Sequence, residues 1–421
     1  MLGVLVDSMG TVNQHSQPSF EVIIVGAGVA GCSAAYHLQQ HGIQDVLVLD
    51  AASVPGALPS GSAIMPSAPC VKMMVQVYAG SSNDFCKHHG TEGAQRYLNA
   101  TRCGLAIQKE VANCIWQRDA SKHLQGLGSY YMAYKQDESE LRREYEKLTD
   151  LGCDQDDIVW CDRARLASVD GLSSKFHCAI YFPNDAVIDS SFYAKTLLNY
   201  VSQKSNGRTK FLANSRMEKV TETGSTITVQ LESGDVYSAK HIVMSTGALH
   251  RHAPLHGIIK PCYSYLVHVP TKEKEPCQTS ANFFTWGFTH DWCYTNGNVR
   301  ISGEDHFSAY KPSKVHERCA NLSRWTLQQY GCTIDEKLIA SCPQQYGVYS
   351  ETPDMVPLIG TLGGENSRVC YLLGCNAWGQ TILSYCSSLV PGLLGYRELT
   401  PVELDAMKLV SIRRFSELPC H

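Results

Sequence analysis

The sequence lacks the features that identify several classes of protein. It contains no C-x-x-C pair and no H-E-x-x-H motif, so zinc has no support in it. It has no block of lysine or arginine, and its formal net charge is -4, so nucleic acid is not an expected partner. No apolar run reaches the roughly 18 residues that a membrane-spanning helix needs, so we expect no transmembrane segment.

The sequence also lacks recognisable targeting signals and a regular cysteine pattern. Its first ten residues show neither the basic nor the long apolar region of a secretory signal, and its last four match neither a peroxisomal signal nor a prenylation box. The 18 cysteines are scattered from Cys32 to Cys420. We interpret them as reduced thiols, and we expect a cytoplasmic protein.

The chain does have the length and apolar content for two to three packed domains, with 421 residues of which 44% are hydrophobic. Near its start, a buried strand at 22–25 leads through a glycine turn into a helix with apolar Ala34, Ala35 and Leu38, and then into a second strand at 46–49. This order predicts a βαβ unit.

The rest of the chain alternates between helical and β-rich patterns. Residues 85–150 are charged and helical in pattern, with no clear strand, which indicates an inserted helical layer. The further expected elements are a helix at 192–201, strands at 227–231 and 242–245, β-rich sequence at 257–303, and a helix at about 313–330.

The clearest motif is the glycine turn between the first strand and the first helix. In such a turn one glycine permits the tight bend, one lets backbone amides approach a pyrophosphate, and one lets the helix pack closely on the strand. The anion would lie at the positive helix N-terminus, and Asp50, at the end of the next strand, would bind ribose hydroxyls. The motif predicts dinucleotide binding without separating FAD from NAD. It consists of Gly26, Ala27, Gly28, Val29, Ala30 and Gly31.

Two further segments have the composition of cofactor-binding loops. The first contains Ser60, Gly61 and Ser62, whose small side chains can donate to phosphate without blocking a close backbone approach. The second is the strand that runs into Gly247, which would let the chain pass close beneath a cofactor. Taken alone, the first is equally compatible with a solvated turn, and the second with an ordinary buried strand.

A fourth motif lies near the C-terminus, in the segments 346–360 and 372–380. The second segment opens the last predicted helix with two glycines. The residues that we expect to lie against the cofactor are Gly347, Gly374, Asn376, Trp378, Gly379 and Gln380.

In their order from residue 21 to about 415, these motifs resemble those of the D-amino-acid oxidase, glycine oxidase and sarcosine oxidase family. The segments 346–360 and 372–380 resemble the family's "G-L-R-P-x-T-P-D-x-x-P-x-I-G" and its later "G-x-x-x-x-G". The resemblance implies an α/β fold, in which a Rossmann-like FAD-binding domain carries an inserted substrate domain of antiparallel sheet and helices. It also implies non-covalent FAD, with the last helix pointing its N-terminus at the flavin ring.

On this resemblance we divide the chain into a leader and two discontinuous domains. The leader comprises residues 1–19 and is expected to be flexible. The FAD-binding domain comprises 20–84, 185–256 and 340–421. The substrate domain comprises 85–184 and 257–339.

The sequence departs from the family pattern at two positions. Tyr349 occupies the place of an arginine that holds the substrate carboxylate in glycine- and D-amino-acid-oxidising relatives. Gly347 occupies the place of the cysteine that attaches flavin covalently in sarcosine oxidases, which excludes attachment by that route, although Cys342 lies on the same segment.

Other residues are candidates for the substrate site. Arg300 resembles an arginine of several relatives and would meet a substrate carboxylate, or favour superoxide formation near the flavin. If Ile301 faces the flavin instead, Arg300 is structural. Tyr263 and Tyr265 share one face of a strand by its period of two and are candidates to line the substrate cavity, although packing in a core is the commoner role. Together with Arg300, Tyr349 is a candidate catalytic residue.

The resemblance implies oxidation of a small amine or amino acid, with hydride transfer from the α-carbon to the flavin and hydrolysis of the product imine. Reoxidation would use O₂, giving H₂O₂. One alternative is a dehydrogenase of an amino acid or 2-hydroxy acid that uses another electron acceptor. A second alternative, suggested by Tyr349, is a flavin-binding assembly or interaction protein without turnover.

Overall fold

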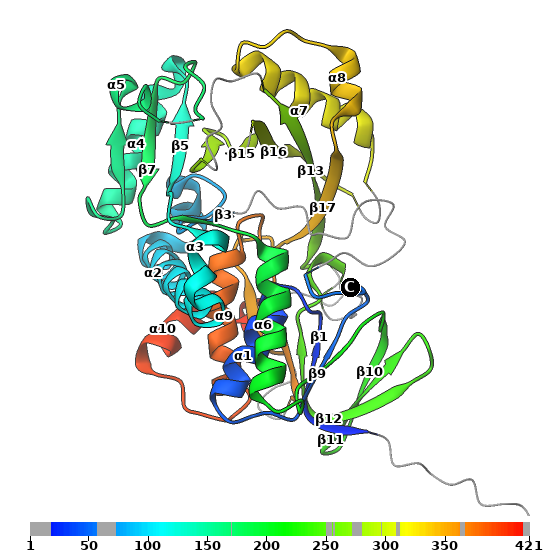
Figure 1. The fold of residues 1–421 in the computed structure, drawn as a ribbon. Coiled ribbons are helices and arrows are strands. Elements are labelled where there is room, and N and C mark those ends of the chain that lie inside the picture. Colours follow the sequence, from blue (N-terminus) through cyan, green and yellow to red (C-terminus); the bar gives the residue numbers. More distant parts are fainter. Residues whose placement is uncertain are drawn as a thin grey trace, which may run out of the picture.

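The computed structural model places the chain in two lobes, each built on its own sheet (Figure 1). It describes residues 18–56, 73–169, 171–249, 255, 257–271, 280–295, 297–308, 312–362 and 367–415. The predicted leader lies almost entirely outside these residues. Within the described part, no helix is long and apolar enough to cross a membrane, and the cysteines are free thiols.

The first sheet has a parallel centre with the strand order β19-β12-β1-β2-β9. The first strand and helix of the chain form the predicted βαβ unit with β2, because β1 is buried on both faces and α1 returns the chain to the same edge. These elements are β1 (Ser19–Val25), α1 (Val29–Gln40), β2 (Val46–Leu49), β9 (Lys210–Leu212), β12 (Val236–Met244) and β19 (Val369–Leu373).

Antiparallel strands extend this sheet on the side of β12 that faces away from β1. The hairpin of β10 (Met217–Thr223) and β11 (Thr226–Leu231) pairs with the first half of β12, and β18 (Leu358–Thr361) pairs with β19. The predicted strands at 227–231 and 242–245 are therefore confirmed, the second as the end of β12.

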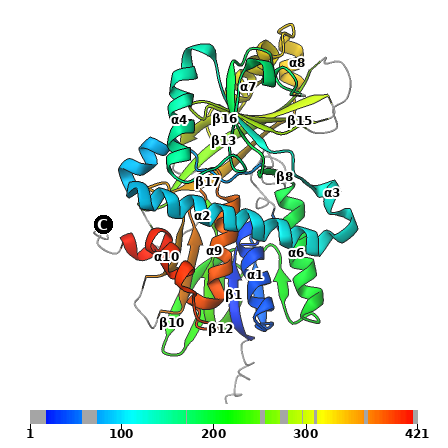
Figure 2. The same cartoon turned by 90° about the vertical axis from the view of Figure 1, so that its left-hand side faces the viewer.

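Helices cover one face of the first sheet. α1 packs on α6 (Ser190–Lys204) and α9 (Gln380–Leu393), and α2 (Ser82–Trp116) packs across α9, as Figure 2 shows. Gly104 of α2 approaches the backbone of Thr381 so closely that a Cβ at Gly104 would collide with it. This close packing places α2 with the helices of the first lobe, although residues 85–184 were assigned to the substrate domain.

The second sheet collects strands from distant parts of the chain in the order β17-β13-β16-β15-β14-β5-β7-β6. Residues 85–150 contain one of them, β5, so the prediction of no strand in this segment was wrong: β5 is a short apolar run between two helices. The strands are β5 (Ser129–Ala133), β6 (Val159–Cys161), β7 (Cys178–Phe182), β13 (Lys260–Pro270), β14 (Asn282–Thr285), β15 (His290–Thr295), β16 (Asn298–Phe307) and β17 (Gln344–Glu351).

Helices flank both faces of the second sheet. α7 (Val315–Gln329), the helix expected at about 313–330, packs on β13 and β16, with α8 (Glu336–Ser341) beside it. α4 (Glu138–Asp150) contacts β5 and β7. The remaining elements are α3 (Ala120–His123), α5 (Arg163–Leu166), α10 (Pro401–Val410) and a small sheet of β3 (Met73–Met74), β8 (Ala186–Ile188) and β4 (Leu124–Gln125).

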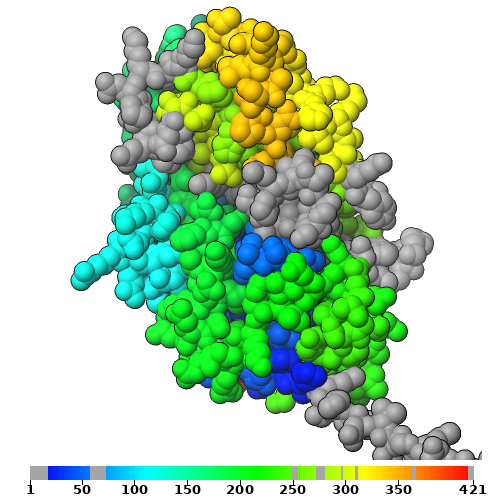
Figure 3. Space-filling model, turned by 45° about the vertical axis from the view of Figure 1, so that its right-hand side comes forward, coloured from blue at the N-terminus to red at the C-terminus, as the bar shows by residue number. Residues whose placement is uncertain are grey.

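The two faces of the second sheet belong to different cores. Alternate residues such as Val299, Ile301 and Trp292 pack in the cluster that includes α7. Residues on the opposite face of the same sheet, such as Leu266 and Phe284, belong to the cluster that continues into the first lobe. We call this second face of the sheet, opposite α7, the inner face. Figure 3 shows the first lobe in blue and green at one end of the surface and α7, α8 and β17 in yellow and orange at the other.

Candidate cofactor and substrate site

The glycine turn after β1 is closed by close backbone packing. Gly26 has a φ of 108°, which favours glycine, and a Cβ there would collide with the backbone of Ser245 at the end of β12. A Cβ on Gly31 would collide with the carbonyl oxygen of Gly26. These two glycines therefore bring α1 against the ends of β1 and β12, as the sequence predicts.

Gly28 differs, because a Cβ there would meet no atom of the described chain within 4 Å. It is the N-cap of α1 and provides no side-chain cap, so the N–H groups of Val29, Ala30 and Gly31 lie at an uncapped helix N-terminus. Open space at the positive end of a 12-residue helix suits an anion such as a pyrophosphate.

Asp50 lies directly beside this turn. Its carboxylate accepts hydrogen bonds from the backbone N–H of Ala27 at 2.5 Å and of Ala52 at 2.7 Å. Burial raises the pKa of Asp50, and the two N–H donors oppose that effect. Because each carboxylate oxygen can accept more than one hydrogen bond, the group remains able to bind ribose hydroxyls.

The end of β12 lies against the same turn. Ser245 Oγ donates to the carbonyl oxygens of Gly26 at 2.9 Å and of Val25 at 3.1 Å. Thr246 Oγ1 is buried without a hydrogen-bond partner in the described part of the chain. Gly247 has a φ of 59°, with no atom within 4 Å of the place for a Cβ. An unpartnered hydroxyl beside an open glycine fits a bound cofactor at this strand end.

The loop before α9 is held by its own hydrogen bonds. Asn376 and Ala377 both have positive φ, 48° and 63°, which is strained for residues other than glycine. Asn376 Oδ1 accepts hydrogen bonds from the backbone N–H of Thr352 at 2.8 Å and from its hydroxyl at 3.1 Å. A Cβ on Gly374 would lie 2.7 Å from the Thr352 side chain, and one on Gly379 would collide with Cys375. Packing thus explains both glycines.

At the start of α9 two predicted residues contact other parts of the protein. Gly379 is the N-cap of α9, so a helix begins where the sequence predicts, but it is not the last helix, because α10 (Pro401–Val410) follows it. Gln380 Oε1 accepts a hydrogen bond from Ser190 at 2.6 Å, while Gln380 Nε2 is buried without a partner among the described residues. Trp378 packs on Phe284 with ring centroids 4.7 Å apart. The ring of Trp378 therefore joins α9 to the inner face of the second sheet.

Strand β17 presents Gly347 and Tyr349 on the inner face, because the alternate Tyr346 and Val348 pack toward α7. Gly347 pairs with Ser264 of β13. β17 also contacts the short helix at 247–249. Tyr349 donates its hydroxyl to Asp305 Oδ2 at 2.9 Å.

Arg300 lies on the inner face, because its neighbours Val299 and Ile301 are in the α7 core. This settles the strand register that the sequence left open. Arg300 Nε is buried without a hydrogen-bond partner, and its guanidinium forms no ion pair in the described part of the chain. A buried N–H donor without a partner is costly unless a ligand or water satisfies it.

Tyr263 and Tyr265 lie on the opposite face from Arg300. Both are buried in the α7 core, and the Tyr265 hydroxyl donates to the carbonyl oxygen of Ser313 at 2.8 Å. Their shared face was predicted correctly, but packing under α7 directs it away from the first lobe. The structure therefore does not bring these tyrosines to the other candidate residues, and it places Ser60, Gly61 and Ser62 outside the described residues.

Asp291 of β15 was not a predicted site residue. It lies on the inner face between alternate core residues, and its Oδ2 accepts a hydrogen bond from Trp378 Nε1 at 3.4 Å. Asp291 Oδ1 is buried without a partner among the described residues. Burial, and to a lesser extent the nearby Asp305, raise the pKa of Asp291 to about 8. The sequence signal that could have identified Asp291 as a site residue is the alternation of a charged Asp291 with an apolar Trp292 in the β-rich segment.

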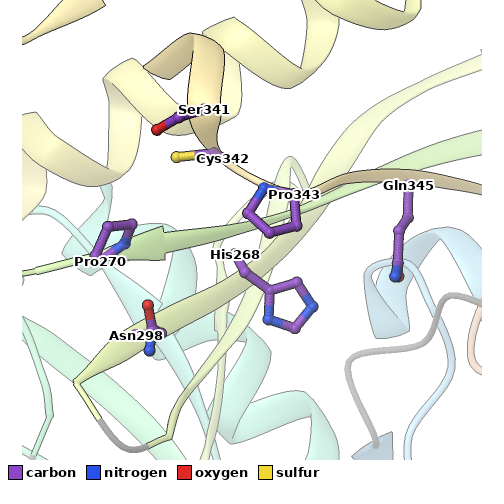
Figure 4. Close-up of a pocket in the computed structure, with 7 residues that line it drawn as sticks. All are labelled: His268, Pro270, Asn298, Ser341, Cys342, Pro343 and Gln345. Atoms are coloured by element: carbon purple, nitrogen blue, oxygen red, sulfur yellow. The ribbon is translucent and has the colours of Figure 1, made fainter. Parts of the chain in front are cut away.

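A separate cavity of about 380 Å³ lies at the far end of the second sheet (Figure 4). Its lining includes His268, which pairs with Arg300 across β13 and β16, and Cys342 at the end of α8. Cys342 is 5% exposed and directs its thiol toward the carbonyl oxygen of Leu338 in α8. The Cys342 thiol is thus engaged within its own helix, and no group of three or more metal-ligating side chains occurs in the described part of the chain.

The parallel sheet, the open turn at Gly28 and the placement of Asp50 define a dinucleotide-binding protein with a second sheet above the cofactor site. The family model described as "FAD dependent oxidoreductase" (DAO) matches residues 21–390. The chain belongs to this family of FAD-dependent oxidoreductases, so FAD is its cofactor.

Solved structures with the same fold include three that share little sequence with this chain. Glycine oxidase from Geobacillus kaustophilus is 17% identical with a TM-score of 0.68, covering 91% of this chain and 96% of its own. Iminodiacetate oxidase from Chelativorans sp. BNC1 is 16% identical with a TM-score of 0.67, covering 91% of this chain and 98% of its own. The L-alpha-glycerophosphate oxidase from Mycoplasma pneumoniae, solved with FAD bound, is 14% identical with a TM-score of 0.67, covering 90% of this chain and 95% of its own. No curated protein matches the sequence.

Proposed function

We propose that this FAD-dependent oxidoreductase oxidises the C–N bond of a small amine or amino acid. The observation that carries the proposal is the unpartnered Arg300 on the inner face, on the side of the second sheet that meets Trp378 at the start of α9. A guanidinium with an unsatisfied N–H suits a carboxylate, which it can bind with two parallel hydrogen bonds.

FAD would be held by groups of the first lobe. The uncapped start of α1 at Gly28 would bind the diphosphate, and Asp50 would bind the adenosine ribose. The start of α9 and Gly347 of β17 would lie against the ring, with Thr246 and Gln380 offering unpartnered polar groups. Bound FAD supplies the two-electron acceptor. Ser60, Gly61 and Ser62 remain predicted cofactor contacts.

The substrate would be positioned mainly by the inner face of the second sheet. Tyr349 already donates its hydroxyl to Asp305, so it is less available to a carboxylate than Arg300. We therefore assign the carboxylate to Arg300 and keep Tyr349 as a wall of the site. Imine hydrolysis in water needs no further group of the protein.

The test is anaerobic reduction of the bound flavin by matched pairs of compounds. Each pair contains an amino acid and the 2-hydroxy acid with the same side chain, together with simple amines. We expect bleaching of the flavin by at least one amine or amino acid, and slower or no bleaching by the hydroxy acids. Bleaching by the hydroxy acids alone would refute C–N oxidation.

Two other functions are alternatives for a protein with this fold, and the same panel of compounds tests both. A solved neighbour is an L-alpha-glycerophosphate oxidase, and this supports considering a C–O substrate, which the hydroxy acids test. Oxygen consumption after reduction separates an oxidase from a dehydrogenase with another acceptor. A flavin-binding protein without turnover predicts that no compound of the panel reduces the flavin.

A further inference from the structure

An acidic and a basic side chain lie on the inner face without pairing with each other. Asp291 Oδ1 and Arg300 Nε are both buried, and neither has a hydrogen-bond partner in the part of the chain that the structure describes. A buried polar atom without a hydrogen-bond partner is unfavourable unless a ligand or water satisfies it. An unsatisfied acidic group and an unsatisfied basic group on one face, without an ion pair between them, indicate a ligand that interacts with both.

The spacing of the two groups follows from the strand register. Asp291 pairs with Ser302, and Arg300 pairs with Cys293, so Asp291 and Arg300 are diagonal neighbours on adjacent strands. Diagonal neighbours on one face are about 7–8 Å apart at their Cα atoms. A short acidic side chain and a long basic one at this separation can bind the two ends of one small zwitterion, with a hydrogen bond of about 2.9 Å at each end.

The surroundings of Asp291 also suit a cation. The rings of Trp378, Phe284, Phe288 and Tyr131 form one aromatic cluster around the same part of the inner face. Trp378 donates to Asp291 and thereby orients its carboxylate. Aromatic faces attract ammonium groups, most strongly where water is excluded.

We propose that Asp291 binds the amine nitrogen of the substrate and takes its proton, on the same face on which the proposed function assigns the substrate carboxylate to Arg300. This inference rests on the proposed function. In the proton step, Asp291 first loses its own proton to solvent, and its carboxylate then takes one proton from the substrate ammonium, which yields a neutral amine and a carboxylic acid. The neutral amine retains the lone pair that C–N oxidation requires, and the electrons then pass to FAD.

The charged and titratable groups around Asp291 are compatible with this role. Asp305 raises the pKa of Asp291 further, Arg300 lies on β16 and Tyr131 on β5, while α9 contributes the uncharged Trp378. With its pKa at about 8, Asp291 is mostly protonated at pH 7 before the ligand binds. Binding of the zwitterion therefore releases one proton to the solvent.

The test uses two ligands that flavin cannot oxidise at an α-carbon, because neither has an α-hydrogen. 2-Aminoisobutyrate carries an ammonium where pivalate carries a methyl group, and the two are otherwise alike. In the holoenzyme at pH 7, calorimetry in two buffers of different ionisation enthalpy should show release of close to one proton on binding 2-aminoisobutyrate and none on binding pivalate. Equal proton release for both ligands, or no binding of either, would overturn the proposal.

The matching variant is Asp291→Asn, which keeps the shape of the side chain and removes the charge. It should weaken binding of 2-aminoisobutyrate by at least about tenfold and change binding of pivalate by less than about threefold. Asp235→Asn, in the exposed β11–β12 turn, is the control and should change neither. Equal losses for both ligands, or no loss for either, would contradict the role of Asp291.

The proton measurement on the unaltered protein stands if the variant does not fold. Since neither ligand is turned over, these results do not depend on activity. Failure of the proposed function would instead appear as a flavin that no amine or amino acid reduces.

Discussion

Gly28 is the residue at which the structure leaves space for the diphosphate. Replacing it with Val should abolish FAD retention while leaving the fold intact, because a Cβ at this position meets no atom of the described chain within 4 Å, and the side chain would occupy the space of the cofactor. The measurement is FAD released on denaturation per mole of protein, together with the circular dichroism spectrum.

Gly126 provides the matched control for Gly28. It is exposed, its φ is not positive, and its Cβ position is also open, so Gly126→Val should retain FAD. If Gly28→Val retained FAD as well, the diphosphate would not lie at this turn.

Arg300 is the residue that should decide affinity for a carboxylate. Arg300→Met keeps much of the side-chain volume and removes the guanidinium, so the apparent affinity for an amino-acid substrate should fall by roughly one to two decades. Arg143→Met on the exposed face of α4 is the control. Unchanged turnover of every amino-acid substrate in Arg300→Met would show that Arg300 is structural.

Asp291 should also lower the stability of the protein as the pH rises. Burial holds its folded pKa at about 8, above the value of roughly 4 in an unfolded chain. The contribution of this carboxyl to stability is therefore complete below about pH 4 and is lost as the pH rises through 8. Asp291→Asn does not titrate, so its melting temperature should equal that of the unaltered protein at low pH and exceed it at pH 8 to 9. Parallel curves across this range would show that Asp291 is not buried as described.

Among the elements, the loop between β19 and α9 is the least regular part of the site. Asn376→Ala removes the acceptor of two Thr352 hydrogen bonds, and the free energy of unfolding should fall by about 1–3 kcal/mol. Asn214→Ala is a matched control, since Asn214 also has a positive φ of 53° but is exposed. Both substitutions carry the same backbone strain, so a larger loss at Asn376 in denaturant unfolding measures its side-chain hydrogen bonds. Equal losses would assign the effect to strain alone.

Among the elements, those determined by residues close together in the sequence could be predicted, and those that depend on distant residues could not. The glycine turn, β1, α1 and β2 were predicted, because neighbouring residues determine a tight turn and a buried strand. β5 was missed, because five residues in a helical region form a strand only when β7 and β14 pair with them from far along the chain.

For the whole molecule, the family and the cofactor could be predicted because the motifs recur in a fixed order along the chain. The direction in which each strand face points could not, because it depends on which layer covers the sheet. Tyr263 and Tyr265 share a face as expected, yet α7 covers that face. Asp291 and Arg300 become neighbours through pairing of β15 with β16, which the sequence does not specify.

The central claim is that the two lobes together oxidise a C–N bond with FAD. The most direct measurement is a single anaerobic turnover, in which reduced flavin, released amine or ammonia, and carbonyl product are counted against each other. The account predicts one amine and one carbonyl product for each FAD reduced, because the imine is hydrolysed in water. Flavin reduction without release of amine or ammonia, or an amino-acid panel that leaves the flavin oxidised, would contradict it.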